Sequence, residues 1–321
     1  MPELVEAYTT EEAFHARRRL CVGASEVAAL FGCHEYMTAN RLYHLKRGTG
    51  IDDHRRDVAL RNFGHVMEPI IGQLVADKTG WKLDNLTIQE HHLLPSDPRI
   101  GCTVDRFIVE SERGPGILQI KNVSSFSPGW SETRAPDMYE YQVLTELMVE
   151  QEQRGIRWGC IGALFGGDPD NLRVMVRYPD PKVEKAIRQR VARFWDMVLS
   201  GREPPIVSDD FEHVADMFKA AETREEEVRR LGVDWQEVAV NFVNARAARL
   251  AAEKVENEAK AKLLRAAMIE KVEGMERDLA VVCPDLTVEF KITDVAARAV
   301  NVGAYRQLNI NVKENQKEIN G

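Results

Sequence analysis

The chain has 321 residues, of which 44% are hydrophobic and 29% charged, a balance typical of a soluble globular protein. No window approaches eighteen consecutive apolar residues, and the N-terminus lacks a basic segment followed by an apolar one. We therefore expect no transmembrane helix, no secretory signal and a cytoplasmic location. The net charge of −8 argues against a protein that coats nucleic acid, but it does not exclude an enzyme with a local basic groove.

The cysteines are five in number and widely spaced. No Cys-x-x-Cys pair or Cys/His cluster exists, which argues against a zinc or iron–sulfur site. We expect free, mostly buried thiols, which suit a reducing compartment. They are Cys21, Cys33, Cys102, Cys160 and Cys283.

The N-terminal part of the chain predicts helices. Ser25 is a plausible N-cap for the apolar run that follows it, and Thr38 is one for the next helix. Residues 58–79 carry apolar side chains at helical spacing. Glu68 lies in this helix directly before Pro69, which predicts a kink or a fresh start there.

From about residue 82 the hydrophobic period changes to that of strands. Residues 101–121 predict a β-hairpin that turns at 112–116. His91 and His92 are adjacent on a predicted strand, so they point to opposite faces and cannot easily share one metal ion; we interpret them as surface residues. Beyond the hairpin, we expect helices at 136–151 and 180–200 and strands at 160–165 and 172–176.

The composition shifts after Pro204-Pro205. Residues 210–273 are almost free of Gly and Pro, and they predict long charged helices, with a short hairpin following at 279–292. We therefore divide the chain into a first domain, 1–206, and a helical extension with a short β-hairpin, 207–321. A solvated helical face or an oligomer contact is the simplest interpretation of the extension, and we expect it to contact a partner or other subunits.

The predicted hairpin carries the residues with the clearest chemistry. Asp105 leaves one strand, and Gln119 and Lys121, two residues apart, leave the next strand on the same side. A carboxylate and an amide oxygen are hard ligands of the kind that Mg²⁺ and Mn²⁺ prefer. A lysine beside them can orient a water and stabilise negative charge in a transition state. Phosphodiester hydrolysis uses groups of these kinds.

Asp105, a turn and then Leu118-Gln119-Ile120-Lys121 resemble the motif of PD-(D/E)XK nucleases. Over about residues 15–205 the chain is similar to the YqaJ-type viral recombinases, a lambda exonuclease-like branch of that superfamily. The flanking segments that carry this resemblance are Arg18 to Val27, Phe31-Gly32 with Tyr36-Met37-Thr38, Gly64 to Pro69, Trp130 with Pro136, Tyr139 and Gln142, Phe194-Trp195, and Pro204-Pro205.

The resemblance implies an α/β fold in which helices flank a central mixed sheet. It also implies a Mg²⁺- or Mn²⁺-dependent exonuclease that degrades linear double-stranded DNA for phage-type homologous recombination, by two-metal phosphodiester hydrolysis in the bacterial host cell. Double-stranded DNA ends, a single-strand annealing protein and a homo-oligomer are the partners that it implies. An endonuclease of the same fold is an alternative.

The family roles transfer to matching positions. The resemblance implies that Asp105, Glu68, Gln119 and the backbone carbonyl of Ile120 bind the metals and that Lys121 activates water. Arg18 and Ser25 would hold phosphate, and Gln142 would position the water or the DNA. Each has a plainer interpretation: Glu68 as a helix-dipole carboxylate, Arg18 as a solvated charge, Ser25 as a cap, and Gln142 as a polar residue on a half-buried helix.

Gln119 departs from the family, whose motif has Glu or Asp at this position. Glutamine keeps one ligand oxygen but loses the charge, so metal affinity should fall, and a second metal should suffer most. Three interpretations stay open: a natural variant that supports catalysis, an engineered Glu→Gln substitution that traps an inactive complex, and a domain that lost hydrolysis but binds DNA ends or a partner.

Overall fold

The chain divides into two compact units, Met1–Thr223 and Arg224–Gly321. The computed structural model describes residues 5–7, 18–49, 58–84, 90–220, 235–269, 279–282, 286–295 and 305–314. The first unit extends past the boundary at residue 206 that the sequence predicts. In the described residues no helix is both long and apolar enough to cross a membrane.

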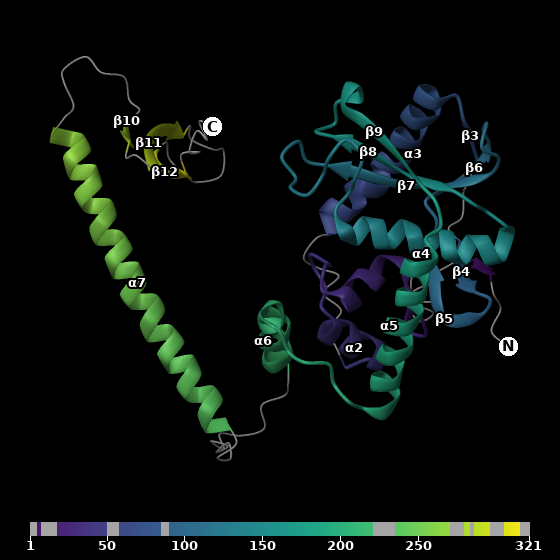
Figure 1. Ribbon diagram of the computed structural model, residues 1–321, viewed down its shortest axis with the longest axis horizontal. Coiled ribbons are helices and arrows are strands. Elements are labelled where there is room, and N and C mark those ends of the chain that lie inside the picture. Colours follow the sequence, from purple (N-terminus) through teal and green to yellow (C-terminus); the bar gives the residue numbers. More distant parts are fainter. Residues whose placement is uncertain are drawn as a thin grey trace, which may run out of the picture. The chain divides into compact units, whose positions relative to one another are not determined.

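A five-stranded mixed sheet forms the centre of the first unit (Figure 1). Its order is β3-β6-β7-β8-β9, and only β7 and β8 run parallel. The hairpin expected at 101–121 is present as β6 and β7, but Asp105 lies at a bend before β6 and not within a strand. The strands are β3 (Lys82–Leu83), β6 (Arg106–Glu110), β7 (Gly116–Val123), β8 (Gly159–Phe165) and β9 (Leu172–Arg177).

Two helices cover the two faces of this sheet. Ile71 and Val75 of α3 (Val58–Thr79) share a hydrophobic cluster with Leu118 of β7. Val143 and Leu147 of α4 (Asp137–Arg154) share a second cluster with Ile117, the preceding residue of β7. Since neighbouring strand residues point to opposite faces, the sheet lies between α3 and α4. The expected mixed sheet flanked by helices is thus confirmed.

A smaller mixed sheet lies beside the central one, in the order β1-β4-β5-β2. The helices α4 and α5 both contact η1, and η1 also contacts β5 of this sheet. The strands are β1 (Val5–Ala7), β2 (Val22–Gly23), β4 (Glu90–Leu94) and β5 (Asp97–Cys102); the helical segments beside them are η1 (Ala24–Phe31), α2 (Ala39–Arg47) and α5 (Pro181–Ser200).

The helix ends follow the capping residues, with one exception. Thr38 caps α2 as expected, because its hydroxyl accepts a hydrogen bond of 3.0 Å from the Arg41 N–H. Ser25 is not the cap of η1: the cap is Gly23, whose N–H donates to the Glu26 carboxylate at 2.8 Å. The helix α3 continues through Pro69 as one element.

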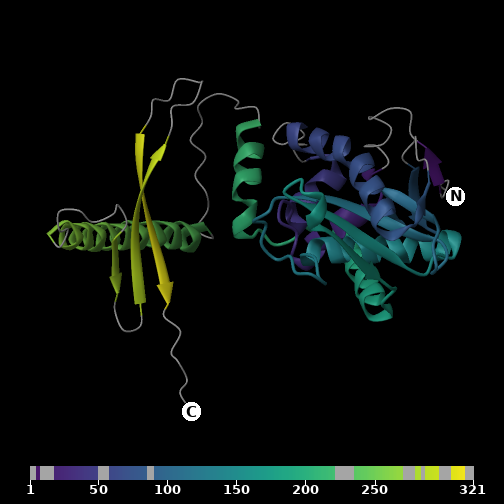
Figure 2. The same cartoon turned by 90° about the horizontal axis from the view of Figure 1, so that it is seen from above.

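The end of the first unit and the second unit complete the chain. The segments η2 (Pro169–Asn171), η3 (Ser208–Asp210) and α6 (Phe211–Ala220) belong to the first unit. Asp210 is buried and accepts a hydrogen bond from the Thr38 hydroxyl. The second unit holds α7 (Gln236–Ile269) and an antiparallel sheet of β10 (Leu279–Val282), β11 (Leu286–Val295) and β12 (Tyr305–Glu314) (Figure 2). The hairpin expected at 279–292 is β10 with β11, whereas the sequence did not predict β12.

Candidate active site

The carboxylate of Asp105 is held against strand β7. Its Oδ2 accepts a hydrogen bond of 2.7 Å from the backbone N–H of Ile120 and one of 2.6 Å from the side-chain amide of Gln119. The bend before β6 turns Asp105 towards the strand, so it reaches β7 although it is not part of a strand itself. The structure therefore brings three of the predicted site residues into direct contact.

Helix α4 adds a second set of polar groups. Lys121 Nζ donates to Gln142 Oε1 at 3.2 Å, and Gln142 Nε2 donates to Glu146 Oε1 at 3.0 Å. Gln142 and Glu146 are four residues apart, so they share one face of α4. Gln142 was predicted from the sequence, whereas Glu146 was not. The spacing of four residues between Gln142 and Glu146 shows in the sequence that both lie on one face of the helix. It does not reveal whether that face meets the sheet.

Lys121 is held between two groups. Besides its bond to Gln142, its Nζ lies 4.9 Å from the centre of the Tyr139 ring, within the range of a cation–π interaction. Tyr139 in turn lies 5.3 Å from Trp130, which also meets Phe165 edge to face at 5.4 Å between ring centres. Trp130 thus packs on its own domain. These contacts fix the ammonium group beside Gln119 on the α4 side of the sheet.

Glu68 approaches the same carboxylate from α3. Burial raises the pKa of Asp105 to about 6; the Lys121 charge opposes this increase, whereas the Glu68 charge adds to it. The Glu68 carboxylate is 3.0 Å from His65 Nδ1, and the imidazole also acts on Asp105. The structure therefore brings Glu68 into electrostatic range of Asp105, together with His65, which the sequence did not indicate.

Two buried oxygens at the site have no hydrogen-bond partner among the described residues. They are Oε1 of Gln119 and Oε2 of Glu146, and these residues are 2% and 1% exposed. Burial, and then the Asp105 charge, raises the pKa of Glu146 well above its ordinary value. An unsatisfied buried polar group costs about 1–3 kcal/mol, so a cluster of them calls for a ligand or another compensation.

The donor set at this site fits a hard divalent cation. Asp105 and Glu146 offer carboxylate oxygens, and Gln119 offers an amide oxygen. In the part of the chain that the structure describes, no cluster of three or more His, Cys, Asp or Glu side chains is arranged to hold a metal. Asp105, Glu146 and Gln119 together offer two carboxylates and one amide, because position 119 holds a glutamine and not an acid.

A cavity of about 490 Å³ shares the Tyr139 ring with Lys121. Asn122 and Tyr139 form part of its wall, and Tyr36 and Trp130 add two more aromatic rings. Its volume lies in the range of small-molecule sites, which is roughly 300–1,000 Å³. A flat apolar group such as a nucleobase can fit against these rings.

Arg18 and Ser25 form a group of their own. Arg18 Nη2 donates to Ser25 Oγ at 3.2 Å and lies 3.4 Å from Glu26 Oε1. The buried ammonium of Lys46 binds Glu26 Oε2 at 2.6 Å. Burial raises the pKa of the Glu26 carboxyl, but the Lys46 and Arg18 charges outweigh burial, and the pKa is lowered. The sequence missed Glu26 and Lys46, which hold Arg18 beside Ser25.

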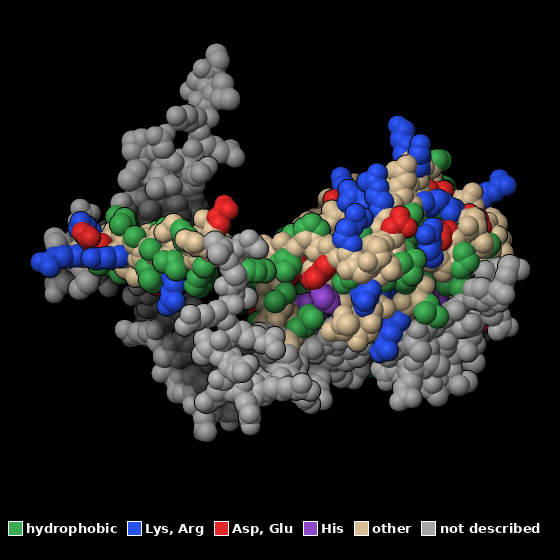
Figure 3. Space-filling view, turned by 90° about the horizontal axis from the view of Figure 1, so that it is seen from below, with side chains coloured by type: hydrophobic (Ala, Val, Ile, Leu, Met, Phe, Trp, Pro, Cys, Tyr) green, Lys and Arg blue, Asp and Glu red, His purple; other side chains and the backbone are tan. Residues whose placement is uncertain are grey.

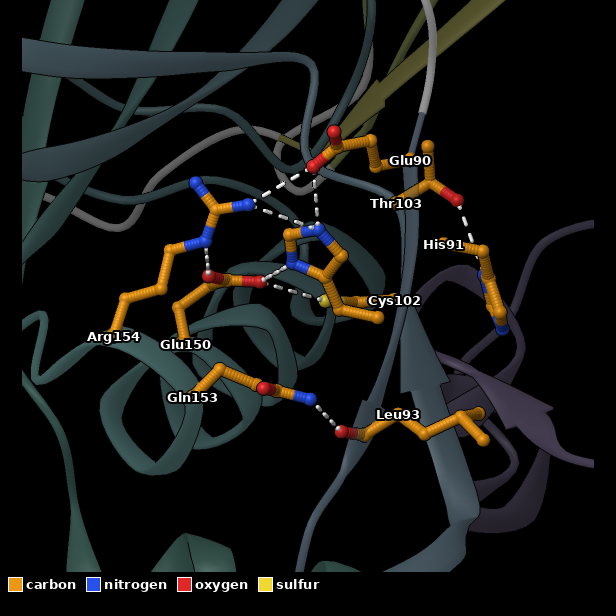
Figure 4. Close-up of polar contacts among 9 residues, drawn as sticks. Glu90, His91, Leu93, Cys102, Thr103, Glu150, Gln153 and Arg154 are labelled. Carbon is orange, nitrogen blue, oxygen red and sulfur yellow. Dashed lines mark hydrogen bonds and ion pairs between the residues drawn. The ribbon is translucent and has the colours of Figure 1, made fainter. Parts of the chain in front are cut away.

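The prediction that His91 and His92 lie at the surface is wrong, because both are buried. Figure 4 shows polar contacts around them, including that of His91 with Thr103. They do point to opposite faces of β4, but both faces are covered. His92 binds the Glu150 carboxylate through Nδ1 and Glu90 through Nε2 at 3.1 Å, whereas His91 Nε2 lies 3.3 Å from the Cys21 sulfur. Glu150 is one turn beyond Glu146 on α4, so this network fixes the register of α4 at the site.

Comparisons with known proteins find one family model and several solved structures that are similar to this chain. Residues 13–153 match the family model of the YqaJ-like viral recombinase domain. Among solved structures, the alkaline exonuclease LHK-Exo from Laribacter hongkongensis is 16% identical, with a TM-score of 0.43, and the match covers 66% of this chain and 100% of that chain. LHK-Exo in complex with dAMP matches with the same identity and coverage and a TM-score of 0.44. No curated protein matches the chain.

Proposed function

We propose that this chain, whose residues 13–153 match the family model of the YqaJ-like viral recombinase domain, is a divalent-metal-dependent exonuclease. Its substrate is linear double-stranded DNA, which it degrades from the ends for phage-type homologous recombination. The observation that carries the proposal is the contact of Asp105 with Gln119 and Ile120, beside a lysine fixed on the same strand.

We assign the metal ligands to the oxygen donors around Asp105. Asp105, Gln119 and the backbone carbonyl of Ile120 come from one side of the site, and Glu68 reaches it from α3. The cation is Mg²⁺ or Mn²⁺, and when bound it polarises the scissile phosphate and lowers the pKa of a bound water. The buried setting supports this assignment, because a hard cation compensates the charge that Asp105 and Glu68 bring together.

Lys121 acts on the attacking water and on the charge that develops on the phosphate. Its ammonium group is held by Gln142 and by the Tyr139 ring, so little reorganisation is needed when negative charge appears. Gln142 keeps this lysine in place and reaches the water or the DNA. Arg18 and Ser25 hold a phosphate of the DNA, with the buried Glu26 carboxylate orienting the guanidinium.

Gln119 changes how the site behaves without metal. Its amide nitrogen donates to Asp105 at 2.6 Å, a distance at which two carboxylates repel each other unless a proton or a cation lies between them. Glutamine thus stabilises the metal-free site. Its oxygen Oε1 accepts no hydrogen bond from the described residues and is left for a cation, but a neutral amide oxygen binds a hard cation more weakly than a carboxylate does.

The test is hydrolysis of an end-labelled linear duplex with Mg²⁺ or Mn²⁺, by the wild-type chain and by Gln119→Glu. We expect both to release nucleotides from the ends, and Gln119→Glu to reach half-maximal rate at an about tenfold lower metal concentration, since it adds a charged ligand. Closed circular duplex of the same sequence is the control and should stay intact. Cleavage of circles indicates an endonuclease instead, and no hydrolysis by either protein contradicts the proposal.

Gln119 also favours a second candidate function, a catalytically inactive module that binds DNA ends or a protein partner. Calorimetric titration with Mn²⁺ separates the two functions. If neither the wild-type chain nor Gln119→Glu binds the metal, while DNA ends still bind, the inactive module is the correct function.

The second unit is the proposed contact for other subunits or for a single-strand annealing protein. Its helix α7 exposes a series of large apolar side chains, visible in Figure 3. Val240, Val243 and Leu250 are spaced by three and seven residues, as in the seam of a coiled coil. The exposed apolar residues on or next to α7 are Trp235, Val238, Val240, Phe242, Val243, Leu250 and Val255.

Removal of the second unit should spare hydrolysis and change assembly. The truncation is best made after Thr223, because Asp210 and α6 belong to the first unit. We expect the truncated chain to keep hydrolysing DNA but to form a smaller oligomer with lower processivity, as measured by light scattering and by product length. A matched full-length variant, Val243→Glu with Leu250→Glu, should show the same change. Unchanged mass and processivity in both would contradict this role.

A further inference from the structure

We propose that Glu146 on α4 supplies the metal-binding carboxylate that Gln119 does not, so that the second acid of the site stands on a helix and not on strand β7. This inference rests on the proposed function, and it assigns a ligand that the sequence motif does not contain. It favours the interpretation of Gln119 as a natural variant, because a site that takes its second carboxylate from α4 needs no glutamate at position 119.

The geometry places Glu146 on the side of the sheet where Gln119 lies. Ile117 of β7 shares a cluster with Val143 and Leu147 of α4, so residues 117, 119 and 121 all face this helix. Lys121 is bound to Gln142, and Gln142 to Glu146, so an unbroken chain of hydrogen bonds joins the motif lysine to this carboxylate.

Two buried oxygens between β7 and α4 are free to act as ligands of a cation. Glu146 is 1% exposed, and its Oε2 has no hydrogen-bond partner among the described residues; Gln119 is 2% exposed, and the same holds for its Oε1. A buried carboxylate without a compensating charge is costly, and a divalent cation compensates two of them at once. Asp105 and Glu146 are close enough for each charge to matter to the other.

Glu150, the next buried acid along α4, allows a comparison of the partners of two buried carboxylates. It is fully buried and binds the His92 imidazole through Oε1, and its Oε2, which accepts no hydrogen bond among the described residues, lies 3.5 Å from the Arg154 guanidinium. Glu146 receives its one described hydrogen bond from the neutral amide of Gln142. Two acids one turn apart on one helix thus differ in their partners. Glu150 forms an ion pair with Arg154, whereas Glu146 forms none within the described residues; the Lys121 charge lowers the pKa of Glu146, but burial raises it more.

The test is Glu146→Gln in the full chain, with Mn²⁺ affinity measured by calorimetry in the absence of DNA. Glutamine has the same shape and can still accept from Gln142, so the metal-free protein should melt at the same temperature or higher. We expect the Mn²⁺ affinity to fall by about tenfold or more. Glu150→Gln is the matched control: it should lower the melting temperature but leave the Mn²⁺ affinity unchanged.

The swap Gln119→Glu with Glu146→Gln moves the carboxylate back to β7. We expect it to regain Mn²⁺ affinity to within about threefold of the wild type, because the number of charged ligands is restored. A structural role for Glu146 would not produce this rescue. If Glu146→Gln does not fold, Glu146→Asp keeps the charge but shortens the reach, and it should bind Mn²⁺ more weakly than the wild type.

The outcomes separate this inference from the proposed function. If the wild type binds Mn²⁺ and hydrolyses DNA while Glu146→Gln, or Glu146→Asp in its place, binds Mn²⁺ equally well, the assignment of Glu146 is wrong and the nuclease function stands. If the wild type binds no Mn²⁺ and hydrolyses nothing, the proposed function falls and the assignment falls with it.

Discussion

Asp105→Asn is expected to lower metal-dependent hydrolysis of linear duplex DNA by roughly a thousandfold and to remove most Mn²⁺ binding. Asp105 has the central position in the site: its carboxylate contacts Gln119 and Ile120, and the charges of Lys121, Glu68 and Glu146 all act on it. Asparagine keeps the oxygen that accepts these hydrogen bonds but loses the charge that a hard cation needs. End-labelled duplex degradation and calorimetry measure the two effects.

The free energy of unfolding of Asp105→Asn, measured against pH, tests whether this variant is folded. Because burial raises the pKa of Asp105 to about 6 from an ordinary value near 3.8, the metal-free wild type loses stability as pH rises through about 6. Asparagine has no such charge to bury. Asp105→Asn should therefore be at least as stable as the wild type at pH 8 in EDTA, and its stability should lose that part of the pH dependence. A stable variant that retains full hydrolysis would show that Asp105 is not at the active centre.

Lys121→Met is expected to lower kcat by roughly 100- to 1,000-fold while leaving Mn²⁺ affinity unchanged or slightly higher. The ammonium group is placed to stabilise charge in the transition state, an effect of about that size when one such donor is removed. It does not offer a metal ligand, and its positive charge opposes a nearby cation. Methionine has a similar length and can keep the contact with the Tyr139 ring. Single-turnover kinetics at saturating metal separate kcat from binding.

Lys82→Met is the matched control for the lysine prediction. Lys82 lies on β3, at the edge of the same sheet, and its side chain is 69% exposed and paired with Glu110. Its replacement should leave kcat unchanged within about twofold, because exposed ion pairs contribute little. If Lys121→Met loses Mn²⁺ affinity and kcat together, the lysine acts by organising the ligands and not on the reacting water.

Local sequence patterns predicted much of the site because they depend on neighbours along the chain. The two-residue period of a strand is enough to place Gln119 and Lys121 on one side of β7, and a hairpin is enough to bring Asp105 near them. Thr38 as the cap of α2 and the extent of α3 up to Gly80 follow from the same short-range chemistry. The resemblance to a known family then supplied Glu68, Arg18, Ser25 and Gln142 as candidates.

Tertiary packing decided the rest, because it depends on which face of one element meets another. The sequence gives no sign that α4 turns Glu146 towards β7 and Glu150 towards β4; docking of the helix between two sheets determines this. The same packing covers both faces of β4, which buries His91 and His92 against expectation. A strand or helix pattern specifies the direction of a side chain relative to its own element, and only the assembled layers specify what lies there.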